Sequence, residues 1–151
     1  MRKSNSFKSK WVWILTAISG FIYIVAAFLP AFTVAGGKFM DNNPNDVYFG
    51  GMCLIIGWMS GLVGSVMFFS WLANLFYFSA ILFTLLKKNA GFWFSMVALI
   101  LSPFLYLETE IMVNEGGHMK DIGSFGIGSY IWISSILILL IASSIQKFKK
   151  I

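Results

Sequence analysis

Long apolar runs separated by short polar segments dominate this chain. The longest run extends from Phe49 to Leu86 without a charged residue. A helix rises 1.5 Å per residue, so one straight helix of that length would far exceed the roughly 30 Å hydrocarbon core of a bilayer. The run therefore predicts either two crossings, or one crossing joined to a segment that returns to the side from which it came.

Four apolar runs have about the 20 residues that one membrane crossing needs. We predict an all-α polytopic membrane protein, a single membrane domain over residues 1–151 with spans at 11–32, 68–86, 90–107 and 129–146. The glycine-rich segment 49–67 is predicted to be an interfacial or re-entrant helix on the outer side, and a fifth span is the alternative. We expect residues 33–48 to form a loop, and residues 108–129 are polar and rich in glycine.

The distribution of charge favours four spans. With a cytoplasmic N-terminus, four spans place nine of the eleven basic residues inside and all six acidic residues outside, whereas five spans leave five basic residues inside and six outside. Lysine and arginine in short cytoplasmic loops are the main determinant of orientation. We therefore expect four spans with both termini in the cytoplasm. The nine inner residues are Arg2, Lys3, Lys8, Lys10, Lys87, Lys88, Lys147, Lys149 and Lys150.

Composition supports this class and argues against several others. Hydrophobic residues make up 58% of the chain and charged residues 11%, against about 25% charged in soluble domains. The net charge of +5 comes from basic clusters beside the apolar runs, which is typical of membrane proteins and not of nucleic-acid binding. One cysteine and one histidine leave no disulfide or Cys-x-x-Cys site. We expect no enzyme activity, no cofactor and no nucleic-acid partner.

Three residues within the apolar runs are candidates for helix packing. Asn74 is the most polar residue of the predicted spans, and we interpret it as an interhelical hydrogen-bonding residue in preference to a transport residue. Gly57 and Gly61 have the small-xxx-small spacing that lets helices approach closely. No predicted span contains an ionisable residue of the kind that coupled carriers use.

Four acidic residues on the predicted outer side are candidates for binding a partner. The acidic outer segments would attract cationic partners and select among them. Carboxylates and imidazole are suitable metal ligands, and the candidates are Glu108, Glu110, Glu115 and His118. Gly116 and Gly117, however, break any helix that would present Glu115 and His118 together. We therefore predict no metal site. The candidate partner-binding residues are Glu108, Glu110, Glu115 and Asp121.

Several short motifs resemble a pattern in small, uncharacterised four-span proteins of the bacterial inner membrane. The motifs are WLAN at 71–74, a basic pair at 87–88, EGG at 115–117 and GIGSYIWIS at 126–134. The similarity covers roughly residues 49–145, and the chain departs from the pattern at Leu75, where a proline is common. The resemblance implies a protein of the bacterial inner membrane with four spans, and it brings no known activity.

These features favour a non-catalytic membrane interaction protein. Examples are an accessory subunit of a membrane complex, or an immunity-type protein that binds a pore-forming toxin within the bilayer. Its expected partners are the lipid bilayer and another membrane protein, and an oligomer is compatible with the sequence. The alternative is a small channel or carrier subunit, which would need to oligomerise to form a polar path.

Overall fold

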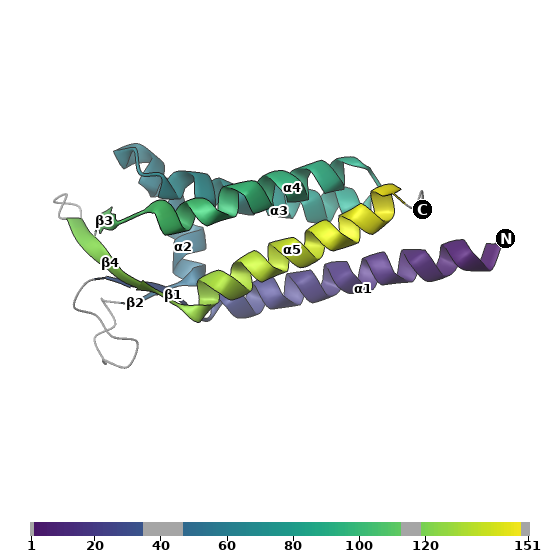
Figure 1. Ribbon diagram of the computed structural model, residues 1–151, viewed down its shortest axis with the longest axis horizontal. Coiled ribbons are helices and arrows are strands. Elements are labelled where there is room, and N and C mark those ends of the chain that lie inside the picture. The colour runs from purple at the N-terminus through teal and green to yellow at the C-terminus, as the bar shows by residue number, and fades with distance from the viewer. Residues whose placement is uncertain (1, 35–46, 113–118, 149–151) are drawn as a thin grey trace.

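The computed structural model describes residues 2–34, 47–112 and 119–148, with the side chains of the first helix described from Lys10 onward (Figure 1). Within these ranges four helical segments are long and apolar enough to span a membrane, which confirms the predicted number. They are α1 (Arg2–Ala27), α3 (Met67–Leu85), α4 (Ala90–Leu101) with its 3₁₀ extension η3 (Ser102–Leu107), and α5 (Ile127–Phe148).

The long helices form an antiparallel bundle in which α1 lies beside α5 and α3 lies beside α4 (Figure 1). The N-terminus, the C-terminus and the turn between α3 and α4 lie at one end, here called the terminal end. All strands lie at the opposite end, here called the sheet end (Figure 1).

The prediction of an all-α fold is wrong in one respect, because the sheet end carries strands. The described chain holds one antiparallel sheet with strand order β2-β1-β4-β3. The strands are β1 (Pro30–Val34), β2 (Val47–Phe49), β3 (Glu110–Met112) and β4 (Met119–Phe125). The predicted loop 33–48 and the polar segment 108–129 therefore contain strand residues at their described ends.

The first predicted helix ends earlier than expected for the same reason. We predicted a helix to residue 32, but α1 ends at Ala27 and β1 begins at Pro30. A proline disfavours helical backbone at the residue before it and is tolerated at the first position of a strand. Phe32 and Thr33 then pair with β4 residues near α5, so the end of α1 is tied to the start of α5.

The segment 49–67 forms two short helices and not a fifth span. α2 (Gly50–Ile56) and the 3₁₀ helix η2 (Gly57–Val63) together make an apolar stretch too short for a crossing. α2 crosses from the α1 side of the bundle towards α3 at the sheet end (Figure 1). The segment therefore begins and ends at the same end, as the charge distribution predicted.

The bundle core combines large side chains, such as Tyr77, Ile136 and Leu139, with serines that form hydrogen bonds between helices. Ser19 on α1 shares a 2.8 Å hydrogen bond with the Tyr77 hydroxyl and donates to the Ser135 carbonyl on α5 at 2.7 Å. Ser95 and Ser143 share a 2.8 Å bond between α4 and α5. Close helix contacts of this kind, together with interhelical hydrogen bonds, hold helices together in lipid.

The terminal end is closed by a tight turn. Lys87 has a φ of 57°, and the Lys88 amide donates to the Phe83 carbonyl while the Lys87 amide donates to Thr84. This is a Schellman cap with lysine at the position where glycine is usual. Gln146 on α5 donates to the Lys88 carbonyl at 3.2 Å, which attaches this turn to the last helix.

Candidate functional site

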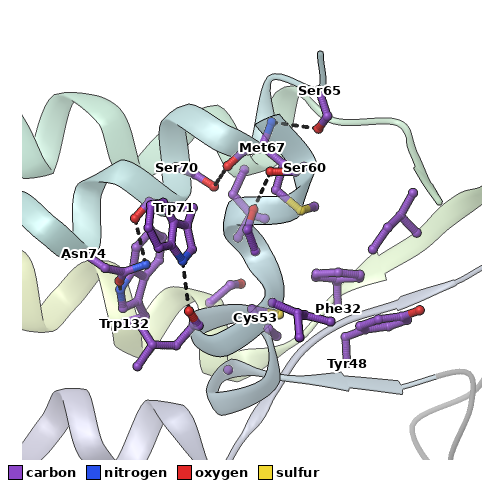
Figure 2. A pocket seen from close by; sticks show the side chains of 18 of the residues that line it. Phe32, Tyr48, Cys53, Ser60, Ser65, Met67, Ser70, Trp71, Asn74 and Trp132 are labelled. Carbon is purple, nitrogen blue, oxygen red and sulfur yellow. Dashed lines mark hydrogen bonds between the residues drawn. The ribbon is translucent and has the colours of Figure 1, made fainter. Parts of the chain in front are cut away.

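A cavity of about 320 Å³ lies at the sheet end, between the bundle and the sheet (Figure 2). Its floor comes from the sheet-end turns of α1, α3 and α5, and α2 with η2 forms one wall. The strands supply the remaining side through residues of β1, β2, β3 and β4. Chain segments far apart in the sequence therefore enclose one space.

Aromatic and methionine side chains make up much of the lining (Figure 2). The rings of Phe32 and Tyr48 are stacked with centroids 4.9 Å apart, so strands β1 and β2 present a flat aromatic surface. Met59 and Met67 line the cavity from η2 and α3. Methionine side chains are flexible and polarisable, and they adapt to ligands of irregular shape.

Asn74 lies at the floor of the cavity and links three helices. Its side-chain oxygen accepts a 2.7 Å hydrogen bond from the Tyr23 hydroxyl of α1 and a 3.0 Å bond from the Trp132 indole of α5. Its amide nitrogen donates to the Trp71 carbonyl of α3 at 3.0 Å. The residue predicted to form an interhelical hydrogen bond thus lies against the cavity, and the geometry here is that of a packing residue.

Trp71 attaches α2 and η2 (residues 50–63), here called the wall segment, to the bundle. Its indole N–H donates to the Leu54 carbonyl of α2 at 2.9 Å (Figure 2). A Cβ at Gly57 would lie 2.7 Å from the Trp71 ring, and one at Gly61 would lie 2.8 Å from the Phe68 ring. The two candidate glycines therefore face aromatic rings of α3, and a larger side chain at either position would push η2 away.

Cys53 belongs to the apolar lining. Burial raises the pKa of its thiol from the ordinary value of 9.0 to about 12. A thiol with so high a pKa stays protonated near neutral pH and is a poor nucleophile. Cys53 therefore contributes packing surface here and no reactive group.

Glu108 has a structural role at the start of α3. Its carboxylate accepts a 2.9 Å hydrogen bond from the Met67 amide and another from the Ser65 hydroxyl. The first amides of a helix lack intrahelical partners, and a negative charge there is favourable. This candidate partner-binding residue thus caps a helix.

The other candidate acidic residues have different positions. Glu110 on β3 lies directly opposite Asp121 on β4, and both are exposed. Like charges at directly opposed positions of two strands repel each other. Glu110 also lines the rim of the cavity. Glu115 lies outside the residues that the structure describes, as does His118.

No metal centre is found in the described part of the chain, where no three His, Cys, Asp or Glu residues gather. Of the four residues considered as metal ligands, Glu115 and His118 lie in the segment that the structure does not describe, so the prediction of no metal site stays untested.

Sequence reasoning missed most of the cavity residues. Tyr23, Trp71 and Trp132 belong to three different helices, and no spacing along the chain relates them. A usable signal was present, since each carries a polar group at the tip of a large ring within an apolar span. Buried tyrosine and tryptophan usually find a hydrogen-bond partner, and Asn74 is the most polar side chain available to them.

No family model matches the chain, and no match was found among curated proteins or among solved structures. The similarity to small four-span bacterial proteins therefore stays a prediction from the sequence motifs.

Proposed function

We propose that this chain is a non-catalytic protein of the bacterial inner membrane that acts by binding a protein partner at its sheet end, on the outer side. It would serve as an accessory subunit of a membrane complex or as an immunity-type protein. Both termini would lie in the cytoplasm. The partner would be another membrane protein or a protein that reaches it from outside.

The orientation is supported by where the basic residues lie. Lys87 and Lys88 form the turn at the terminal end, and Lys147 is in the last turn of α5 at the same end. Such an excess of lysine is typical of the cytoplasmic side. Lys147 also lies over the rings of Phe92 and Trp93, at 3.9 and 3.8 Å from their centroids, which suits the membrane interface.

The wall segment suits the outer interface of the membrane. Its outward side chains are apolar and exposed, including Ile55 at 73% and Leu62 at 74%. Trp58 is also exposed, and tryptophan is enriched at headgroup depth. The segment would therefore rest in the outer leaflet beside the bundle.

The observation that carries the proposal is the exposed pair of carboxylates on Glu110 and Asp121. A cationic side chain of a partner would relieve their mutual repulsion and gain two charge-assisted hydrogen bonds. Several polar residues of the bundle interior, by contrast, bond to each other: Ser19 with Tyr77, and Ser95 with Ser143. They are used in packing, which argues against the channel or carrier alternative.

A carbodiimide, which joins carboxylates to amines at zero distance, tests this proposal in intact cells. We expect it to link the protein to a lysine-bearing partner, and we expect Glu110→Gln with Asp121→Asn to abolish the product. Glu108→Gln is the matched control, because that carboxylate is already bonded to Ser65 and Met67. An unchanged product in the double variant, or ion flux through the purified protein in liposomes, would contradict the proposal.

A further inference from the structure

We propose that the cavity between the bundle and the sheet binds an uncharged amphiphile with a single chain, drawn from the bilayer, whose oxygen accepts a hydrogen bond from Asn74. Pockets for small organic ligands typically begin at about 300 Å³, and this cavity is about 320 Å³. It suits one hydrocarbon chain or ring system and is too small for a whole phospholipid with two chains. This ligand is distinct from the protein partner proposed above.

The hydrogen-bonding capacity of Asn74 specifies the polar part of the ligand. The Trp132 indole can only donate, so the Asn74 oxygen must face it, and the bond from Tyr23 uses the second lone pair of that oxygen. The amide nitrogen has two N–H groups, and one donates to the Trp71 carbonyl. The second N–H has no acceptor among the described residues.

An unmade hydrogen bond at this position is costly. Asn74 lines the cavity and is only 7% exposed, so bulk water does not easily satisfy its second N–H. The oxygen of an alcohol, ester or ketone would accept from it. A ligand with only donor groups would leave both the ligand and Asn74 unsatisfied, because the Asn74 oxygen is fully used.

The charge of the lining favours an uncharged ligand. Glu110, at the rim, is the one acidic or basic residue that lines the described part of the cavity. No lysine or arginine lines the described part of the cavity, so a phosphate or carboxylate would find no counter-charge there. Burying an unpaired charge in apolar surroundings is strongly unfavourable.

The position of the wall segment allows entry from the bilayer. Ile56, Met59 and Val63 line the cavity and are also 42–47% exposed, so the cavity reaches the outer surface of α2 and η2. Neither of these two helices has a fully buried residue. This wall is therefore a single layer of apolar side chains between the cavity and the surface that faces lipid.

Photolabelling of the full chain in lipid nanodiscs tests the site. The probe is a long-chain alcohol with a diazirine in its chain, and labelled residues are mapped by mass spectrometry. We expect labels on α2, on η2 and on the first turns of α3. Cys53→Phe, which fills the cavity, should abolish them, whereas Ile55→Phe introduces the same aromatic ring on the exposed face of the same helix and should not.

Competition with unlabelled compounds tests the role of Asn74. We expect the alcohol to compete about fivefold better than the alkane of equal length, as one neutral hydrogen bond predicts. Asn74→Leu should remove this difference while the alkane competes as before. If Asn74→Leu does not fold, the Cys53→Phe and Ile55→Phe pair decides the question.

Three results would overturn the proposal. One is labelling confined to residues of the long helices that face lipid, such as Leu82 and Ile141, which are both exposed. The second is equal labelling in Cys53→Phe and the unsubstituted protein. The third is a fatty acid carboxylate that competes better than the alcohol.

Discussion

Asn74 joins α1, α3 and α5 at one point, and its two side-chain acceptor bonds come from residues 51 and 58 positions away. The sequence predicted an interhelical hydrogen bond, because an isolated asparagine in an apolar span needs a partner. It did not identify Tyr23 or Trp132, since such partners depend on which faces of distant helices meet. The role of a residue was therefore predictable where its chemistry left few choices, and its partners were not.

Replacing Asn74 should reduce stability more than replacing either donor. Asn74→Leu leaves the Tyr23 hydroxyl and the Trp132 indole without an acceptor, which should cost about 1–3 kcal/mol. Tyr23→Phe leaves the Trp132 bond intact and should cost about 1 kcal/mol. Tryptophan fluorescence during denaturant titration of the purified protein measures both. Ser134→Ala is the control, because Ser134 is exposed and bonds within its own helix. Equal costs for Asn74→Leu and Ser134→Ala would contradict this role.

Cys53 should react slowly with maleimide. A pKa raised from 9.0 to about 12 lowers the thiolate fraction near neutral pH about a thousandfold. Because the protonated form is favoured in the fold, reactivity should rise with pH up to about 12 and not level off near 9. Alkylation rates measured on the native and the denatured chain check this. Asp121→Cys in a Cys53→Ser background places a thiol at an exposed, polar position of β4, and it should react at an ordinary rate.

At the scale of elements, the wall segment depends on close approach to α3. Gly57→Ala would place a Cβ 2.7 Å from the Trp71 ring, so either the ring or η2 must move. We expect Gly57→Ala to lower stability and to change the fluorescence of Trp71. Gly20→Ala is the matched control, since a Cβ there meets nothing within 4 Å and alanine favours a helix by roughly 0.5–1 kcal/mol. A stabilising Gly57→Ala would show that η2 does not pack on α3 in this way.

The helices were more predictable than the strands. An apolar run with charged ends is recognised as a membrane span because its length matches the thickness of the hydrocarbon core. This comparison needs no information about the rest of the chain. β1 holds only five residues and pairs Phe32 with Phe125 near the other end of the chain. The local sequence PAFTV reads equally well as the end of an apolar helix. Pairing with a distant segment makes these residues a strand, and the local sequence has no alternation of polar and apolar residues that would indicate a strand.

Glu108 illustrates the same limit for the candidate site. From the sequence, only the side of the membrane on which Glu108 lies was predictable, so Glu108 was grouped with the other acidic residues of the outer side. The fold places its carboxylate on the Met67 amide, at the start of a helix that begins some forty residues earlier in the chain. Only Glu110 and Asp121 of the original four are described as exposed, and they carry the proposed contact.

At the scale of the whole molecule, the segments that the basic residues predict to lie on one side of the membrane also lie at one end of the bundle. The termini and the Lys87–Lys88 turn lie together, away from the sheet (Figure 1). Alkaline phosphatase fused after Lys88 or at Ile151 should be inactive, and a cytoplasmic reporter at the same positions should be active, because we expect both to lie inside. Active phosphatase at either fusion would refute four spans with cytoplasmic termini.

The cavity itself was not predictable, since it is a space enclosed by segments from most of the chain.

The central claim is that this protein binds its partner at the sheet end and not along the bundle. Photocrosslinking amino acids placed singly at Met119, at Leu137 and at Lys147 of the full chain in living cells test it most directly. Met119 is exposed on β4, two residues before Asp121, so a probe there leaves both carboxylates in place. Leu137 is exposed near the middle of α5, and Lys147 lies at the terminal end. We predict an adduct with a partner protein from position 119 alone, and high salt should abolish this adduct in isolated membranes. Adducts from position 137 with none from position 119 would contradict the claim.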